Sequence, residues 1–525
     1  MRTPTLVDLI HHRALVTPTA IAIETPQRVV SYEELMGTVE AVAAGLHCAT
    51  GYHPGNLIGI CMRDSGDAII AMLAVMLAGE IYVPISASWP PDRAAAIVGA
   101  VSPTMIITDV ESDWSHITGS CPVVEYHDLP ERGRRASAGT RTVPSTSNPV
   151  AYVMFTSGSS GVPKGVAISH ANLLSTYRAW HESYRLDKLD SHLQVADLGF
   201  DVFAGDWIRA LCSGARLHLY SAKRYDGAEL VSQLNDDRIQ CAEFTPASIR
   251  SILSYCRISG ARLPHLRLLI SGSDMLSAAE FRALHRLVDR RCRVVNSYGA
   301  TETSIDNAFF DTTGDRTHLP SEQPVPIGAP LANTRLMVIA DNGSEVAAHP
   351  VEAAHNERAG NGELLIGGPC VGLGYLDHTP DIAHRYLRRT PLGAPARWFR
   401  SGDLAHLAGD GTITLLGRLD AHAKHDGRAL DLTTVEAAVR RLPHIEDCLA
   451  TTTTPGPDQR IVLLVIAVPD SSDSHEVIRD IAADTLGLDR ERIVVRVVPI
   501  IPLTANGKYD RRAVRRQLAD HGVLA

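Results

Sequence analysis

A segment rich in glycine and hydroxyl side chains, residues 155–166, follows a predicted strand and could bind phosphate. It reads Phe155-Thr-Ser-Gly-Ser-Ser-Gly-Val-Pro-Lys-Gly-Val166. Glycines let backbone N–H groups approach phosphate oxygens closely, hydroxyls add donors, and the lysine adds positive charge. It is not a Walker A loop, because no Gly-Lys-Ser/Thr triplet closes a four-residue spacer. The predicted phosphate ligands are Thr156, Ser157, Gly158, Ser159, Ser160, Gly161 and Lys164.

Three charged residues further along the chain could act on such a phosphate. Glu302 is a hard oxygen ligand that suits Mg²⁺. Asp403 can accept two hydrogen bonds and donates none, which suits a diol. Lys508 lies in a Pro-Leu-Thr-Ala-Asn-Gly-Lys turn near the C-terminus. Taken alone, each of these residues would more often be a solvated surface charge.

Alternating helical and strand-like segments must position these residues. Residues 39–46 and 68–77 are typical of helices, whereas 57–62, 81–85 and 150–155 are typical of strands. Alternation at this spacing predicts an α/β fold with parallel strands.

Two further segments bear on the domain organisation. Residues 130–148 are rich in Ser, Arg, Thr, Gly and Pro, which predicts an exposed connection. A strand is predicted at 411–416, followed by a boundary at 417–420. The last 105 or so residues have an αβ pattern of their own that ends in a basic helix near 511–517. We therefore predict domains at 1–417 and 418–525.

Composition excludes several classes of protein. With 525 residues, 45% hydrophobic and 21% charged, the chain is typical of a multidomain globular protein. A net charge of −9 argues against a nucleic-acid partner. No apolar run approaches the roughly 20 residues that span a bilayer, and we expect no membrane partner. The nine cysteines are scattered, which favours free thiols in a reducing cytoplasm over disulfides or a zinc site.

The order of these motifs resembles the adenylate-forming superfamily, specifically the adenylation domains of nonribosomal peptide synthetases. Residues 31–35, 77–85 and 155–166 are similar to its first motifs. Later matches are Phe200-Asp201 with Asp206-Trp207, then 296–302, 362–364 with 374–376, 400–404, 417–420 and 502–508. The resemblance covers nearly the whole chain. It implies a large N-terminal adenylate-forming domain of stacked αβ layers and a small mobile α+β C-terminal domain, hinged near Asp420.

The resemblance implies attack of a carboxylate on the α-phosphorus of ATP, which gives an acyl-AMP and pyrophosphate. Glu302 would hold Mg²⁺, Thr301 would donate to the α-phosphate, and Lys508 would bridge the carboxylate and the phosphate as the main catalytic group. Asp403 would accept from the ribose hydroxyls. The remaining ATP-binding residues implied are Gly272, Ser273, Asn296, Tyr298, Gly299 and Arg418.

The resemblance also implies a substrate pocket, in which Asp201 would hold an α-ammonium. Around the substrate side chain we expect Val202, Gly205, Glu243, Leu269, Ser271, Ser297, Ile305 and Asp306. Two buried carboxylates, Glu243 and Asp306, need a compensating cation. A cationic substrate would supply it, and we expect ornithine first, then lysine or arginine, on an open floor left by Gly205. Alternatively, one acid faces solvent or pairs with a nearby Arg or Lys. A β-amino acid is disfavoured, because its ammonium would lie away from Asp201.

The sequence departs from the family pattern where a thiol would approach. Asp426, Ala429, Thr433 and Thr434 replace the usual residues, and Leu373 replaces a usual arginine. Adenylation is therefore better supported than thioester transfer.

Only 17 residues follow Lys508. We therefore expect a free-standing carrier protein with a phosphopantetheine arm, in a secondary-metabolite pathway, and the sequence leaves room for an accessory protein. Two alternatives stay open: an acyl- or aryl-CoA ligase, and a catalytically degenerate protein that only binds its ligand.

Substitution of Lys508 tests the implied catalytic role. Lys508→Ala removes one aimed charge, which costs roughly 3–4 kcal/mol, or about two to three orders of magnitude in rate. ATP–pyrophosphate exchange should fall by that factor while amino-acid binding survives. Exchange near the wild-type rate would show that Lys508 is not the catalytic lysine.

Overall fold

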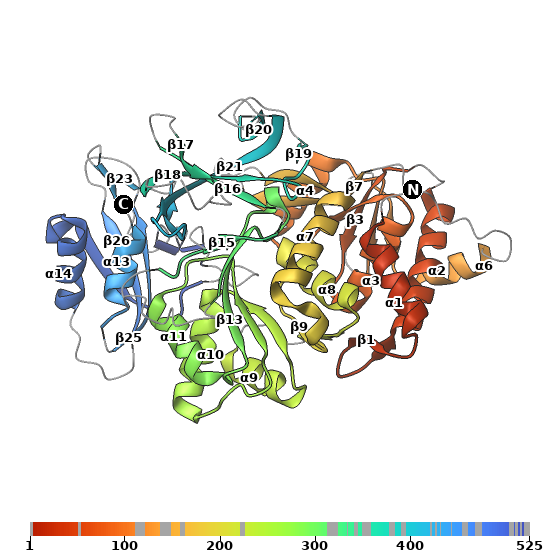
Figure 1. Ribbon diagram of the computed structural model, residues 1–525, viewed down its shortest axis with the longest axis horizontal. Helices are drawn as coiled ribbons and strands as arrows, with labels where there is room; N and C mark the ends of the chain where they lie inside the picture. Colours follow the sequence, from red (N-terminus) through yellow and green to blue (C-terminus); the bar gives the residue numbers. More distant parts are fainter. Residues whose placement is uncertain are drawn as a thin grey trace.

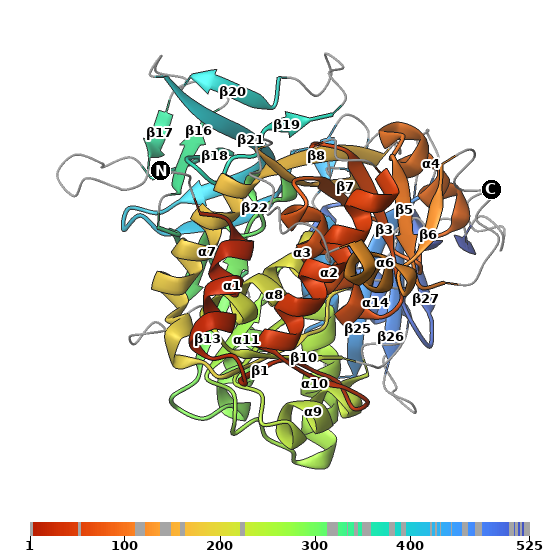
Figure 2. The same cartoon turned by 90° about the vertical axis from the view of Figure 1, so that its right-hand side faces the viewer.

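The computed structural model gives the arrangement of the chain in space (Figures 1 and 2). It describes residues 4–518 except 51–53, 111–120, 137–148, 158–162, 221–225, 312–323, 333, 341–344, 349–358, 377–383, 390–394, 420–422, 426–427, 431, 443, 454–459, 468–474, 503–508, 510–512 and 515–516.

A seven-stranded sheet contains the predicted phosphate-binding segment. Its strand order is β19-β8-β7-β4-β3-β5-β6. The strands are β3 (Leu57–Cys61), β4 (Ile81–Pro84), β5 (Met105–Thr108), β6 (Val123–Glu125), β7 (Val150–Ser157), β8 (Pro163–Ser169) and β19 (Gly374–Tyr375). The pairs among β3 to β7 are parallel, whereas β8 is antiparallel to both β7 and β19. The predicted strands at 57–62, 81–85 and 150–155 are confirmed.

A nine-stranded sheet has the order β15-β14-β13-β12-β11-β9-β10-β1-β2. Its strands are β1 (Ile21–Glu24), β2 (Val29–Ser31), β9 (Ser191–Gln194), β10 (Arg216–Leu219), β11 (Cys241–Phe244), β12 (Leu268–Ser271), β13 (Arg293–Tyr298), β14 (Ala308–Asp311) and β15 (Ala329–Pro330). The central strands β9 to β13 pair in parallel. Their carboxyl ends therefore meet at one edge, where ligands bind in open α/β sheets.

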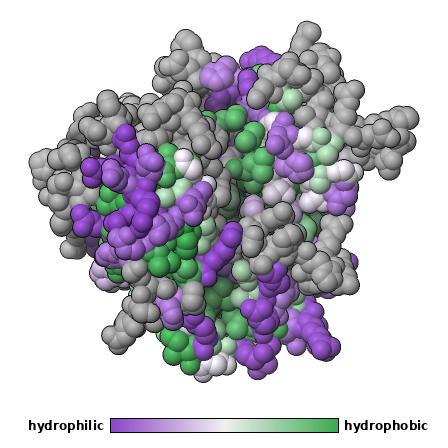
Figure 3. Space-filling model, turned by 90° about the vertical axis from the view of Figure 1, so that its left-hand side faces the viewer, coloured by the Kyte–Doolittle hydropathy of each residue, from purple (hydrophilic) through white to green (hydrophobic). Residues whose placement is uncertain are grey.

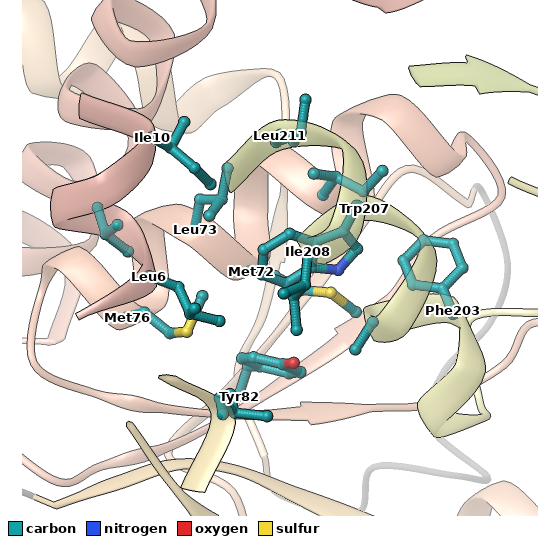
Figure 4. Packing of buried hydrophobic residues seen from close by; sticks show 14 of the residues in the cluster. Leu6, Ile10, Met72, Leu73, Met76, Tyr82, Phe203, Trp207, Ile208 and Leu211 are labelled. Carbon is teal, nitrogen blue, oxygen red and sulfur yellow. The ribbon is translucent and has the colours of Figure 1, made fainter. Parts of the chain in front are cut away.

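Helices lie between these two sheets and form the main core. They are α1 (Leu6–Val16), α2 (Tyr32–Thr50), α3 (Ser65–Leu77), α7 (His170–Tyr184) and α8 (Asp201–Ser213). Figure 4 shows Met72 and Leu73 of α3 facing Trp207 and Leu211 of α8, beside Tyr82 of β4. The same buried cluster includes residues of both sheets, so it joins them into one unit.

The outer faces of the two sheets are covered by other helices. Helix α4 (Pro91–Val101) packs on the seven-stranded sheet. Helices α9 (Gly227–Asp236), α10 (Pro246–Ser259) and α11 (Ala278–Leu287) pack on the nine-stranded sheet. The N-terminal unit is thus built of stacked α and β layers, as the sequence predicts.

An antiparallel sheet in the order β17-β16-β18-β21-β20, with β22 paired to β21, lies above these layers in Figure 1. Its strands are β16 (Arg335–Ile339), β17 (Glu345–Ala348), β18 (Gly360–Gly367), β20 (Tyr386–Arg389), β21 (Pro395–Leu407) and β22 (Ile413–Arg418). The strand predicted at 411–416 corresponds to β22. The sheet carries Asp403 and Arg418 directly opposite one another.

The C-terminal unit has its own core. It contains β23 (Ala423–His425), β24 (Arg428–Leu430), α13 (Leu432–Val439), β25 (Ile445–Thr452), β26 (Ile461–Ala467), α14 (His475–Leu486) and β27 (Ile493–Val497). The predicted α/β class with a large N-terminal and a small α+β C-terminal unit is confirmed. The boundary at 417/418 stays a prediction. The predicted hinge Asp420 and four of the seven residues of the helix predicted near 511–517 lie outside the described residues.

A polar cluster connects the C-terminal unit to α10. Arg250 of α10 donates to the hydroxyl of Tyr509 at 2.7 Å, and the Tyr509 hydroxyl donates to Asp447 at 2.6 Å. Arg440 of the C-terminal unit reaches the same carboxylate at 2.9 Å.

Figure 3 shows the face on this side of the molecule, where hydrophobic residues form separate patches among hydrophilic ones.

The prediction of an exposed connection at 130–148 is wrong in its first part. Residues up to Ala136 belong to α6 (Asp128–Ala136). Two ion pairs at i, i+4 support this helix: Asp128 with Arg132 at 3.1 Å, and Glu131 with Arg135. Composition alone misses this pairing.

The cysteines and the longest helices bear on two further expectations. All nine cysteines are free. Among the described residues, every helix is either too short or too polar to cross a membrane.

The contact between α2 and α6 generates a stability prediction. A Cβ atom on Gly45 of α2 would lie 2.2 Å from the carbonyl oxygen of Leu129, whereas one on Gly37 of the same helix would meet nothing within 4 Å. Gly45→Ala should destabilise the fold by about 1–3 kcal/mol through overpacking. Gly37→Ala should stabilise it by up to about 1 kcal/mol, because alanine is the better helix former. Thermal unfolding of both variants measures this difference, and equal midpoints would contradict the close contact.

Candidate functional site

Several of the predicted substrate residues lie where parallel strands end. Glu243 lies near the end of β11, Ser271 ends β12, and Ser297 lies near the end of β13. In the register, Phe244 faces Ser271 and Ser271 faces Asn296, so the three strand ends are level. The predictions of Leu269 and Ser271 as pocket residues are wrong: Glu243 lies opposite Ile270 in the register, so Leu269 and Ser271 lie on the other face of the sheet, where Leu269 packs in the core under α9 to α11. Glu243 and Ser297, which share the opposite face, form one wall of the site.

Helix α8 supplies the facing wall. Asp201, Gly205 and Arg209 are spaced four residues apart on α8 and so lie on one face of the helix. Asp201 is the first residue of the helix, where the positive end of the helix dipole stabilises a carboxylate. Val202 follows it. The next positions on this face, Gly205 and Arg209, lead into the interior.

Arg209 is the central charge of this site, with only 1% of its residue surface exposed. Its Nη2 donates to Asp206 Oδ1 at 2.8 Å and to Glu243 Oε2. Its Nη1 lies 3.5 Å from Asp306 Oδ2. The guanidinium also lies over the ring of Trp180, 4.7 Å from its centroid. One cation thus contacts three carboxylates from separate parts of the chain.

Asp306 is held by hydrogen bonds on both oxygens. Ser297 donates to Oδ1 at 2.7 Å, and the indole N–H of Trp180 donates to Oδ2 at 2.9 Å. Tyr184 donates in turn to the hydroxyl of Ser297 at 3.5 Å. Asp306 is therefore fixed from helix α7, strand β13 and helix α8 together.

Burial changes the pKa values of these groups. Desolvation raises the pKa of Glu243 to about 8 and that of Asp206 to about 6, against the attraction of Arg209. Burial likewise raises the pKa of Asp306. Burial alone would lower the pKa of Arg209, but the surrounding carboxylates raise it, so the guanidinium stays charged.

Two expectations about the pocket need correction. The open floor expected at Gly205 is wrong: a Cβ atom there would lie 3.3 Å from Arg209 Nη1 and 3.5 Å from Ile305 Cγ2. Of the two alternatives for Glu243 and Asp306, the structure has the pairing with a nearby arginine. The protein supplies one compensating cation itself, because Arg209 reaches the pocket from one turn beyond Gly205.

A strained turn positions Ile305 and Asp306. Ser304 and Ile305 have φ angles of 63° and 78°, a backbone conformation that is costly for residues other than glycine. The carbonyl oxygen of Ile305 would lie 1.7 Å from a Cβ atom on Gly299, so only glycine fits there. The backbone N–H of Asn307 then donates to the carbonyl of Tyr298 at 2.7 Å. The turn folds Asp306 back against the end of β13.

The predicted nucleotide-binding residues lie on neighbouring elements. Tyr298 donates to Asp403 Oδ2 at 2.5 Å, and Arg418 reaches Asp403 Oδ1 at 3.1 Å. Burial raises the pKa of Tyr298, and the neighbouring carboxylate of Asp403 raises it further. Thr156 and Lys164 face one another across the β7–β8 hairpin. The Asn296 amide donates to the carbonyl of Pro326 at 2.9 Å.

Glu302 is buried in the 3₁₀ helix η2 (Thr301–Thr303). The hydroxyl of Tyr375 donates to Oε1 of Glu302 at 2.6 Å. We therefore assign the other oxygen, Oε2, as the candidate metal ligand. A single carboxylate of this kind fits Mg²⁺, which binds through one or two carboxylates together with substrate phosphates. Thr301 precedes it in the same turn.

Other predicted residues have the following places. A Cβ atom on Gly272 would lie 2.6 Å from Glu243 Oε1, and Ser273 has a positive φ of 73°. Lys508, Asp420 and the loop residues Gly158, Ser159, Ser160 and Gly161 lie outside the described residues, as does the side chain of Ser157.

The sequence prediction omitted Arg209, Trp180 and, as a pocket residue, Asp206. A signal for Arg209 was present: it lies four and eight residues after Gly205 and Asp201, which places all three on one face of a helix. Trp180 gave no such signal, because its approach depends on how α7 packs on α8.

Comparisons with known proteins agree on the fold. Residues 10–376 match the model of a family described as AMP-binding enzyme. Gramicidin S synthase 2 of Brevibacillus brevis is 30% identical over 511 residues, which cover 97% of this chain and 11% of that protein. Phenyloxazoline synthase MbtB of Mycobacterium tuberculosis is 30% identical over 521 residues, which cover 98% of this chain and 35% of that protein. The chain thus spans about a tenth to a third of the length of these two relatives.

Solved structures are similar over nearly the whole chain. Klebsiella oxytoca NpsA in complex with 3-hydroxyanthranilyl-AMSN has a TM-score of 0.81 and 23% identity, covering 99% of this chain and all of that one. The four-domain nonribosomal peptide synthetase AB3403, bound to AMP and glycine, has a TM-score of 0.79 and 24% identity. That match covers 98% of this chain and 36% of the other.

The raised pKa of Glu243 predicts a pH dependence of stability. Because its pKa rises from 4.5 when unfolded to about 8 when folded, the folded state binds an extra proton between these values. The free energy of unfolding therefore falls as pH rises through this window. Between about pH 7 and about pH 8.5, above the usual titration range of histidine, the wild type should lose thermal stability and Glu243→Gln should lose less. Glu33→Gln, at an exposed position, is the control; identical slopes in all three proteins would contradict the prediction.

Proposed function

Because the chain belongs to the family of AMP-binding enzymes, we propose that it activates an amino acid with a cationic side chain as its adenylate. Ornithine is the first choice, followed by lysine and arginine. Membership of this family makes the chain an adenylate-forming ligase and implies the use of ATP.

The single observation that carries the choice of substrate is the charge of the buried site. Asp206, Glu243 and Asp306 surround one guanidinium, so the group has a negative excess once two of the three are ionised. A bound ammonium beside Glu243 would lower its raised pKa and favour the ionised form. Both oxygens of Asp306 already accept hydrogen bonds, Oδ1 from Ser297 and Oδ2 from Trp180 and Arg209. Arg209 bonds Glu243 through Oε2, so we assign the other oxygen, Oε1, as the acceptor for the side-chain ammonium.

Asp201 supports an amino acid over a simple acid. Its place at the start of α8 puts a carboxylate on the face that leads to Gly205 and Arg209. An α-ammonium held there would direct the substrate side chain along this face toward Glu243. An aryl or fatty acid has no cation for Asp201, which disfavours an acyl- or aryl-CoA ligase.

The reaction joins the amino-acid carboxylate to the α-phosphorus of ATP and releases pyrophosphate. We assign Thr156, Lys164 and the loop between them to the phosphates, and Asp403 with Arg418 to the ribose. Lys508 would offset negative charge as the two anions approach one another. Glu302 and Thr301 face the α-phosphate in this assignment, and Mg²⁺, held by Glu302, would supply further positive charge when bound.

We further propose that the aminoacyl group passes to the phosphopantetheine thiol of a carrier protein in nonribosomal peptide synthesis. The departures at Leu373 and around Asp426 make this step the less supported half of the proposal. A protein that binds its ligand without catalysis is the alternative of another class, and pyrophosphate exchange distinguishes the two.

The test is ATP–pyrophosphate exchange with single amino acids. Ornithine should exceed norvaline, which has the same chain without the terminal amine, by at least about two orders of magnitude, because norvaline leaves a buried acceptor unpaired. Glu243→Gln should reduce exchange with ornithine far more than with norvaline.

Each outcome bears on a different part of the proposal. Higher exchange with neutral amino acids would overturn the cationic substrate and indicate that Glu243 is protonated in the complex. Binding of an amino acid without exchange would favour the noncatalytic alternative.

A further inference from the structure

Arg209 lies at the inner end of the proposed substrate pocket. Its residue lies about 6 Å beyond Gly205 and about 12 Å beyond Asp201 along the axis of α8, from the rise of 1.5 Å per residue. The guanidinium folds back toward Gly205, since Nη1 lies 3.3 Å from where a Cβ atom would stand. An arginine side chain thus fills the space beside Gly205, on the helix face that leads inward from Asp201.

The guanidinium is held in place from four directions. Asp206 and Glu243 accept from the same nitrogen, Nη2, and Asp306 lies beside Nη1. The guanidinium carbon lies over the ring of Trp180, an arrangement that attracts a cation. A planar group with so many fixed contacts is a firm boundary for a neighbouring side chain.

We propose that Arg209 is a specificity-determining residue that limits the length of the side chain the enzyme activates. The inference rests on the proposed function. A substrate held by Asp201 can extend only as far as the guanidinium beside Gly205, where Glu243 Oε1 would meet its terminal amine. A substrate that carries a guanidinium of its own would compete with Arg209 for the same carboxylates.

Shortening Arg209 should therefore lengthen the preferred substrate. In Arg209→Ala the space above Gly205 opens and the three carboxylates lose their cation. The guanidinium of a bound arginine can then take the place of the missing one. We expect the ratio of exchange rates, arginine to ornithine, to rise by at least about tenfold, the usual effect of a change in pocket length.

Arg209→Met is the matched control. Methionine keeps an unbranched chain in the same path but removes the charge, so it fills much of the space that alanine leaves open. If length decides, the ratio rises in Arg209→Ala and changes little in Arg209→Met. An equal rise in both variants would mean that charge decides, and an unchanged ratio in both would mean that Arg209 only supports the fold. Either result overturns the proposal.

The experiment uses pyrophosphate exchange with ornithine, lysine and arginine, together with calorimetric binding of ornithine and arginine. If Arg209→Ala fails to fold, the double variant Arg209→Ala/Glu243→Gln, which carries one acid fewer, is compared with Arg209→Met/Glu243→Gln by the same ratio. Failure of the wild type to exchange with any of the three amino acids overturns the proposed function, whereas a wild type that works and variants whose ratio is unchanged overturn this inference alone.

Discussion

A guanidinium shared by three buried carboxylates is the constraint on which the pocket depends. Arg209 and Asp206 come from α8, Glu243 from β11, and Asp306 from the turn before β14. Removing Arg209 would leave the buried carboxylates without their cation, a loss that typically costs about 3–5 kcal/mol. The helix, the central strand and the turn are therefore held in register by charge as well as by packing.

The same region links the substrate pocket to the proposed nucleotide site. Strand β13 carries Ser297, which bonds Asp306, next to Tyr298, which bonds Asp403 on the antiparallel sheet. Successive residues on a strand point to opposite faces. One strand thus contacts both sites, and Glu302 follows four residues after Tyr298 in the turn that leads back to Asp306.

Much of this arrangement is predictable from sequence, because it depends on local pattern. The strands at β3, β4 and β7 follow from buried apolar runs, and the fold class follows from the order of the motifs. Of the expected pocket residues, Glu243, Ser297 and Asp306 do lie together around Arg209, whereas Leu269 and Ser271 lie on the other face of their sheet. The expectation at Gly205 failed for a physical reason: the space beside a glycine is decided by side chains from neighbouring turns and strands. Helix α6 was missed because its support comes from charge pairs that composition does not reveal.

Long-range contacts lie beyond such prediction. Trp180 reaches Asp306 only because α7 packs against α8, across 126 positions of sequence. Arg250 meets Tyr509 across 259 positions. Neither pair has a local pattern that a single sequence could reveal.

The turn at Ser304 and Ile305 has a consequence for local dynamics. Two successive residues in the left-handed region store about 1–3 kcal/mol each, which opening of the segment would release. The turn stays closed because neighbouring segments hold it: Ser304 donates to the carbonyl of Cys370 at 2.8 Å, and Gly372 donates to the carbonyl of Glu302 at 2.9 Å. The turn at Ser304 and Ile305 therefore depends for its stability on contacts with residues 370–372. Its resistance to hydrogen exchange should follow that of residues 370–372, so the turn and this segment, which joins β18 to β19, would open as one cooperative unit.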